Sequence, residues 1–212
     1  MRDLTQGPIP RNLVQMAVPI AVGMLAQALY FLVDLYFVAQ LGDAAIAGMS
    51  AAGIAMFFVM ALTQTLGVGT AALVSQAVGR KDPDDANLVF NQSLVLAAIC
   101  LAATLIGGYA LTEGYMRAIA ADAATAAAGT SYLYWFLPGL ALQYVSIVMM
   151  SALRGTGVVQ PTMIVQMVTV LLNVVLAPML IAGIGTGRPL GVAGAGLAST
   201  ISIAVGVLLL SF

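Results

Sequence analysis

Residues 13–38 read LVQMAVPIAVGMLAQALYFLVDLYFV, and this stretch decides the fold. It is longer than the ~20 apolar residues with which a helix crosses the ~30 Å hydrocarbon core of a bilayer. It contains Pro19, which removes a backbone hydrogen bond, and one acid, Asp34. An ionised Asp inside a membrane helix is costly and usually faces a polar cavity. Two interpretations are open: Asp34 is a proton or cation switch with Pro19 as its hinge, or Asp34 snorkels to water and Pro19 is a tolerated kink.

The composition is that of an integral membrane protein. Of 212 residues, 62% are hydrophobic and 7% are charged, whereas soluble domains carry about 25% charged residues. The apolar runs are continuous rather than alternating, which favours helical spans over a β-barrel. The net charge of −1 offers no basic surface for nucleic acid. The chain has no histidine, and no nucleophile–base pair can be assembled, so we expect neither an enzyme nor a bound cofactor.

The hydrophobic pattern predicts an all-α membrane protein, with residues 1–212 forming one domain of six transmembrane helices. The expected spans are 13–38, 44–78, 87–111, 130–153, 161–182 and 191–212. The polar, alanine-rich stretch 112–128 is expected to be an interfacial helix or loop. Arg154 is expected to lie in the turn that follows the fourth span.

Lysine and arginine predict the orientation, because they are enriched in cytoplasmic loops. Five of them fall on the N-terminal side of the predicted spans and two on the other side: Arg2, Arg11, Arg80, Lys81 and Arg154 against Arg117 and Arg188. We therefore expect a cytoplasmic N-terminus. We expect a multi-pass protein of the plasma membrane, which is the inner membrane in a bacterium or archaeon.

Five stretches of the chain, in this order, resemble one known family. They are VDLYFVAQLGDAAIAGMSAAG (33–53), VSQAVGRKDPDDA (74–86), ALRGTGVVQPTM (152–163), LLNVVLAPMLI (171–181) and GVAGAGLASTIS (191–202). Together they resemble the multidrug and toxic compound extrusion (MATE) transporters, in the DinF-like branch. Members have twelve helices in two six-helix lobes, so the chain resembles the N-terminal lobe alone. The resemblance implies as partners a drug substrate, membrane lipid, and either the C-terminal lobe or a second copy of this chain.

The resemblance also implies secondary active multidrug efflux, in which organic cations or amphiphilic drugs are exchanged for protons or sodium, with antibiotic resistance as the result. It places the coupling carboxylate at Asp34 and the hinge at Pro19. The family's asparagine on the fifth helix falls on Asn173, and its hydroxyl on the sixth helix falls on Ser199. The family's fifth-helix aspartate is replaced here by Ala177. This replacement favours protons over sodium, although Asp34 and Asn173 remain candidate sodium ligands.

The candidate substrate cavity takes its polar lining from residues within the spans: Gln27, Tyr30, Gln64 and Gln143. The alternative for each glutamine is an interhelical hydrogen bond, worth ~0.6 kcal/mol on average. A second function also stays open, a lipid-linked oligosaccharide flippase of the same superfamily. Flippases handle anionic pyrophosphate headgroups and line the cavity with basic residues, and no basic residue is expected well inside a span of this chain.

Cysteine labelling tests the predicted orientation. In a Cys100→Ala background, Glu113→Cys and Arg188→Cys are expected to react with a membrane-impermeant maleimide added outside intact cells. Lys81→Cys is expected to react only after the membrane has been broken, because its loop is predicted to face the cytoplasm. The reverse pattern of labelling would show that the orientation is wrong.

Overall fold

The computed structural model describes residues 9–184 and 187–211 of the chain. Within these ranges all regular structure is helical: α1 (Ile9–Ala39), α2 (Asp43–Gly79), α3 (Pro83–Ile119), α4 (Ala123–Gly155), α5 (Gln160–Ile181) and α6 (Val192–Leu210). In α1 several side chains lie outside the description, among them those of Pro19, Gln27, Tyr30 and Asp34. An all-helical architecture is therefore confirmed.

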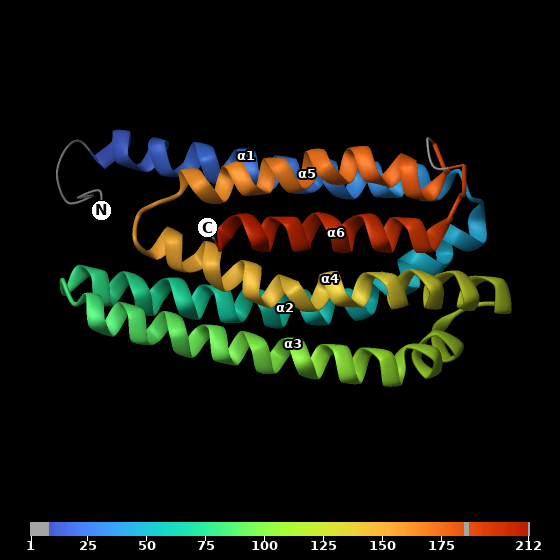
Figure 1. The fold of residues 1–212 in the computed structure, drawn as a ribbon, viewed down its shortest axis with the longest axis horizontal. Coiled ribbons are helices and arrows are strands. Elements are labelled where there is room, and N and C mark those ends of the chain that lie inside the picture. The colour runs from blue at the N-terminus through green and yellow to red at the C-terminus, as the bar shows by residue number, and fades with distance from the viewer. Residues whose placement is uncertain (1–8, 185–186, 212) are drawn as a thin grey trace.

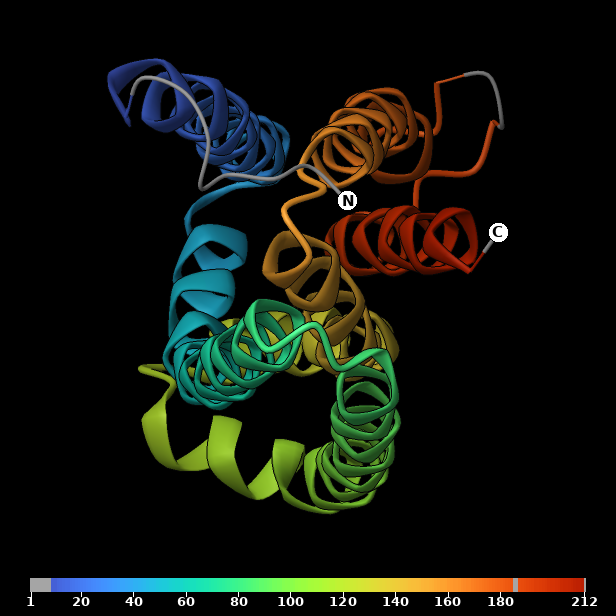
Figure 2. The same ribbon diagram turned by 90° about the vertical axis from the view of Figure 1, so that its left-hand side faces the viewer.

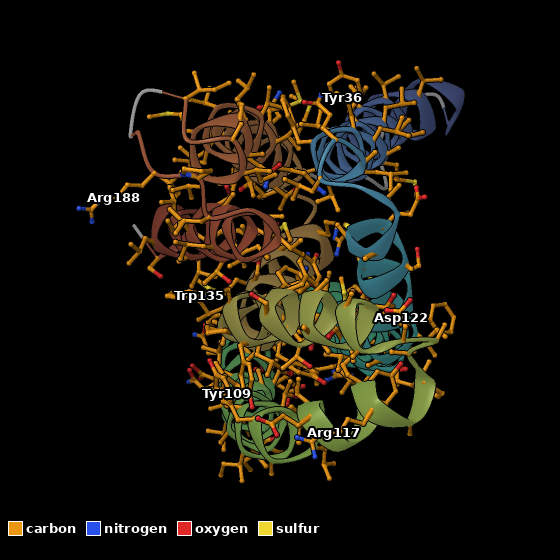
Figure 3. The ribbon with its side chains drawn as sticks, turned by 90° about the vertical axis from the view of Figure 1, so that its right-hand side faces the viewer. Tyr36, Tyr109, Arg117, Asp122, Trp135 and Arg188 are labelled. Atoms are coloured by element: carbon orange, nitrogen blue, oxygen red, sulfur yellow. The ribbon has the colours of Figure 1, made fainter. Side chains whose placement is uncertain are left out.

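Successive helices run in opposite directions through one bundle, with α4 at its centre (Figures 1 and 2). Helix α4 packs against α2, α3 and α6, while α6 packs against α5 and α5 against α1. The α2–α3 turn, the α4–α5 link and the end of α6 lie at one end of the bundle, on the left of Figure 1. We call this the Arg80 end, because Arg80 lies in the α2–α3 turn. At the opposite end, the Arg188 end, Arg188 extends away from the helices and Arg117 lies in the last turn of α3 (Figure 3).

The outer surface of the bundle is apolar. Phe57 is 70% exposed, Phe58 is 68% exposed and Ile106 is 74% exposed. Large exposed apolar surfaces mark contact with lipid or with another protein. Judged on the described residues, five helices, α2 to α6, are long and apolar enough to cross a membrane. The multi-pass membrane character is thus confirmed, whereas the crossing by α1 stays a prediction.

The segment between the third and fourth predicted spans differs from the expectation. Residues 112–128 do not form a separate interfacial element, because α3 continues to Ile119 and α4 begins at Ala123. Glu113 and Arg117 stabilise the extension through an ion pair of 3.3 Å across one helical turn. The alanines at the start of α4 also favour helix.

Both ends of α4 have a local cause. Asp122 caps the start, where its carboxylate accepts a 2.7 Å hydrogen bond from the Thr125 N–H. This bond holds the pKa of Asp122 below its usual value. At the other end α4 continues to Gly155, so Arg154 belongs to the last turn of the helix and not to a turn beyond it.

Pro138 interrupts the hydrogen-bond ladder of α4, and two neighbouring helices repair it. Proline has no N–H to donate to the carbonyl four residues before it, and the Tyr109 hydroxyl of α3 donates to that carbonyl at 3.1 Å. One position further along, the Thr200 hydroxyl of α6 accepts from the Gly139 N–H at 3.2 Å and donates to the Trp135 carbonyl at 2.6 Å. Helix α4 therefore depends on α3 and α6 for part of its backbone hydrogen bonding.

Helices α2 and α4 cross at a pair of glycines. A Cβ atom on Gly48 would lie 2.7 Å from the Gly129 nitrogen, and a Cβ atom on Gly129 would lie 2.8 Å from the Gly48 oxygen. Both separations are shorter than real Cβ contacts, so the two backbones touch directly. Close approach at small residues is a typical way for membrane helices to pack.

Replacing Gly48 with alanine is expected to destabilise the protein, because the added methyl group forces α2 and α4 apart, at a cost of ~1–3 kcal/mol. Gly53→Ala on the same helix is the matched control, since a Cβ atom there has nothing within 4 Å. Thermal unfolding in detergent measures both variants. We expect Tm to fall for Gly48→Ala and to hold or rise for Gly53→Ala, and equal Tm values would contradict the tight crossing.

Candidate functional site

A cavity of ≈ 220 Å³ lies between α1, α2, α4, α5 and α6. It lies toward the Arg80 end, because its walls come from the second half of α4 and the first half of α5. This volume is below the ~300–1,000 Å³ of pockets that enclose drug-sized ligands. The cavity therefore has room for a small molecule, or for one part of a larger one.

The cavity wall combines flexible apolar side chains with neutral polar ones and a single cation. Four methionines supply much of the apolar wall: Met24, Met60, Met150 and Met163. Methionine adapts to ligands of different shape because it is unbranched and polarisable. The polar members are Thr63, Gln64, Gln143, Ser146, Arg154, Thr162, Gln166 and Thr169. Among the described residues that line the cavity, none is Asp or Glu.

Six of these eight polar lining residues were not predicted from the sequence to line a cavity, among them Arg154 and Gln166. The spacing of Arg154 from other residues of α4 could have predicted its place in the cavity lining. Gln143, Ser146, Met150 and Arg154 follow one another at three or four positions, which places them on one helix face. The side chain of Gln166 packs against α1 at Gly23, where an added Cβ atom would lie 3.2 Å from the Gln166 Oε1.

The guanidinium of Arg154 is half-buried and donates a 3.0 Å hydrogen bond to the Ser151 hydroxyl. Ser151 is 1% exposed. It lies directly under α2, where a Cβ atom on Gly67 would lie 3.0 Å from the Ser151 Oγ. The close approach of α2 therefore holds the acceptor in place, and the acceptor directs the arginine.

Asn173 and Ser199 form a buried polar pair between α5 and α6, away from the cavity lining. Both are 0% exposed, and the Asn173 Nδ2 donates to the Ser199 Oγ at 3.4 Å. The Asn173 Oδ1 has no hydrogen-bond partner within the described part of the chain. Leaving a buried oxygen without a partner costs ~1–3 kcal/mol of folding free energy. The Asn173 Oδ1 is therefore available to accept a hydrogen bond or to contact a cation.

The donor set at this pair tests the sodium expectation. Ala177, one turn after Asn173, is buried and supplies no oxygen from its side chain. Hard cations favour several oxygen ligands, usually with carboxylates among them. In the described ranges no group of three or more His, Cys, Asp or Glu side chains is arranged to hold a metal ion. The described donors at this pair are two neutral oxygens, which is fewer ligands than a hard cation takes.

The four candidate residues on α1, Pro19, Gln27, Tyr30 and Asp34, have side chains outside the described set. The backbone places Asp34 near the end of α1 and Ser199 near the start of α6. Both of these helix ends lie at the Arg188 end of the bundle (Figure 1). The structure thus separates the remaining candidates into two places.

Gln64 and Gln143 line the cavity toward the Arg80 end. Asn173 and Ser199 meet between the second half of α5 and the first half of α6.

Comparison with known proteins supplies relatives for this arrangement. The MatE family model matches residues 19–179. The chain is 25% identical over 199 residues to the FAD transporter of Shewanella oneidensis, covering 94% of this chain and 44% of that protein. It is 24% identical over 202 residues to the multidrug export protein MepA of Staphylococcus aureus, covering 93% of this chain and 43% of that protein. The chain therefore spans about half the length of the curated relatives it matches.

Solved structures show the same arrangement of helices. A MOP superfamily transporter from Pyrococcus furiosus superposes with a TM-score of 0.90 at 27% identity, covering 98% of this chain and 45% of that one. An outward-facing multidrug resistance MATE transporter superposes with a TM-score of 0.89 at 27% identity, covering 97% of this chain and 45% of that one. The bundle corresponds to one lobe of such a transporter.

Ser199→Ala is expected to destabilise the protein by ~1–3 kcal/mol, because it leaves the buried Asn173 amide without its acceptor. Ser202→Ala is the matched control on the same helix. Ser202 is equally buried, and its hydroxyl donates at 2.8 Å to the Ala198 carbonyl of its own helix. Thermal unfolding in detergent compares the two. An equal fall in Tm for both variants would show that the Asn173–Ser199 contact adds no measurable stability.

Proposed function

Because this chain belongs to the MatE family, whose members are transporters rather than enzymes, we propose that it exports drugs by secondary active transport. In this proposal organic cations or other amphiphilic molecules leave the cell in exchange for protons, which lowers the internal concentration of antibiotics. One observation carries the proposal. Helix α5 forms a wall of the cavity up to Val170 and, within one turn, carries the buried Asn173. A change in protonation beside Asn173 therefore reaches the cavity through a single rigid helix.

Asp34 is the proposed coupling carboxylate and Pro19 the proposed hinge. Protonation removes the charge of Asp34, and with it the need for a polar surrounding. Helix α1 then bends at Pro19, where a backbone hydrogen bond is missing. Movement of α1 changes the cavity, since Gly23 and Met24 form part of its wall. We propose protons as the coupling ion, because Ala177 leaves Asn173 without a carboxylate one turn away.

The transport pathway needs more than this bundle. The chain covers 45% of a matching transporter structure. We propose that a C-terminal lobe, or a second copy of this chain, faces the bundle and completes the pathway. We also propose that the Arg80 end is cytoplasmic, in keeping with the distribution of basic residues.

The names of the relatives point to different substrates, since one is an FAD transporter and another a multidrug export protein. The flippase alternative was disfavoured because no basic residue was expected inside a span. Arg154 lines the cavity, so that argument no longer holds by itself. Multidrug export remains the better proposal, because the methionine-rich wall suits ligands of varied shape and Arg154 is the one basic residue in the described cavity lining.

Asp34→Asn is expected to abolish proton-coupled efflux while leaving expression and Tm unchanged, because asparagine mimics the protonated form permanently. The measurement is drug export from vesicles that carry the complete transporter, under an imposed pH gradient. Pro19→Ala is expected to slow export and to leave proton binding intact. If Asp34→Asn exports as fast as the wild type, the carboxylate is structural and the coupling mechanism is wrong.

Ala177→Asp serves as the matched gain-of-function variant. It restores the carboxylate that the family places there, so export is expected to become responsive to a sodium gradient. The same vesicles, with sodium in place of the pH gradient, report the change. A variant that stays insensitive to sodium would remove the stated reason for preferring protons.

A further inference from the structure

Arg154 brings a permanent positive charge to a cavity whose described lining contains no acid. Arginine stays protonated at any physiological pH. Within the described part of the chain no Asp or Glu oxygen lies within ion-pair distance of it, because the ion pairs found there are Arg80–Asp85 and Arg117–Glu113. A half-buried charge without a counter-ion is costly. The cost falls when a ligand supplies the opposite charge.

The end of α4 does not need this guanidinium as a cap. The Thr156 N–H donates to the Ala152 carbonyl at 3.0 Å, and the Val158 N–H donates to the Leu153 carbonyl at 2.9 Å. The Gly157 N–H donates to the Arg154 carbonyl at 3.0 Å. The carbonyls of Ala152, Leu153 and Arg154 thus have backbone partners.

The side chain of Arg154 instead turns back along α4 toward Ser151, into the bundle. Its hydrogen bond to Ser151 uses one of the five N–H donors of a guanidinium. The remaining donors form a planar fork, which matches the two oxygens of a carboxylate or phosphate group. The arginine is therefore oriented by Ser151 and still able to bind an anion.

The rest of the cavity suits the body of an amphiphile. Met150 precedes Arg154 by one turn of α4, and Met60 of α2 and Met163 of α5 line the same cavity. The amides of Gln143 and Gln166 supply neutral donors and acceptors beside this apolar wall. A ligand with an acidic group at one end and an apolar ring system at the other satisfies both parts of the wall.

We propose that Arg154 anchors an anionic subsite in this cavity, which binds the carboxylate or phosphate group of a small amphiphilic substrate while the apolar part packs against the methionines. The inference rests on the proposed export function for the role of the ligand as a substrate. Among the amphiphilic substrates proposed above, it favours anionic and zwitterionic molecules over organic cations, and it gives the second half of α4 a specific role.

A matched pair of ligands tests the subsite directly. The probes are 7-hydroxycoumarin-3-carboxylic acid and its ethyl ester, which share one fluorescent ring system and differ in the charge of one group. Fluorescence polarisation measures the dissociation constant of each for the full chain in neutral detergent. The wild type is expected to bind the acid about tenfold more tightly than the ester. Equal affinity for the two probes overturns the proposal without any variant.

Variants of Arg154 then test whether this residue causes the preference for the acid over the ester. Arg154→Gln is expected to bind acid and ester equally, with ester affinity unchanged within about twofold. Arg154→Lys is expected to keep part of the preference, because it keeps the charge and loses the planar fork. Arg80→Gln is the matched control, a basic residue at the same end of the bundle that pairs with Asp85 outside the cavity lining. A loss of preference in Arg80→Gln, or an equal loss of both ligands in Arg154→Gln, overturns the subsite.

Two further measurements distinguish the substrate subsite from a lipid site and from the proposed export function. Phosphatidylglycerol added to the micelles, with phosphatidylcholine as its control, competes for an acidic lipid site. Displacement of the acid by phosphatidylglycerol alone assigns the subsite to a lipid and overturns the substrate assignment. Binding needs no pH gradient, so an acid preference in the chain, combined with failure of the complete transporter to export, refutes the proposed function and leaves the subsite intact.

Discussion

The hydrocarbon core of a membrane offers no water to a broken helix, and this constraint shapes the bundle around Pro138. Hydroxyls from α3 and α6 supply the hydrogen bonds that α4 lacks there. Close contact at Gly48 and Gly129 holds α2 against the same helix. Because α4 touches three neighbours at once, its position fixes theirs. It also fixes the cavity wall that its second half forms.

Much of the fold follows from the sequence because the lipid-facing spans must be apolar and the charges must lie at their ends. The second span was expected at 44–78, and α2 runs over Asp43–Gly79. The extension of α3 to Ile119 was not foreseen, since hydropathy alone marks Glu113 and Arg117 as loop residues. A pair of opposite charges one turn apart keeps such a segment helical, and average hydropathy does not contain that information.

The candidate site was accessible from the sequence in part. The resemblance to the family places an asparagine on the fifth helix and a hydroxyl on the sixth, and the structure brings these two residues, Asn173 and Ser199, into contact. Arg154 was assigned to a loop, because the glycines that follow it are typical of a turn. Its place in the cavity depends on the last turn of α4 and on the approach of α2 at Gly67, which are tertiary features. The role of Asp34 remains a prediction, as its side chain lies outside the described residues.

The bridge formed by Thr200 has a consequence for biogenesis. The ribosome delivers α3 before α4, so Tyr109 is already in the membrane when Pro138 arrives. Thr200 is synthesised later, in the sixth helix, and the Gly139 N–H and Trp135 carbonyl receive their bridge only then. Helix α4 thus acquires its final backbone hydrogen bonds after two further helices have been inserted. The order of synthesis makes α6 the element that completes the middle of the bundle.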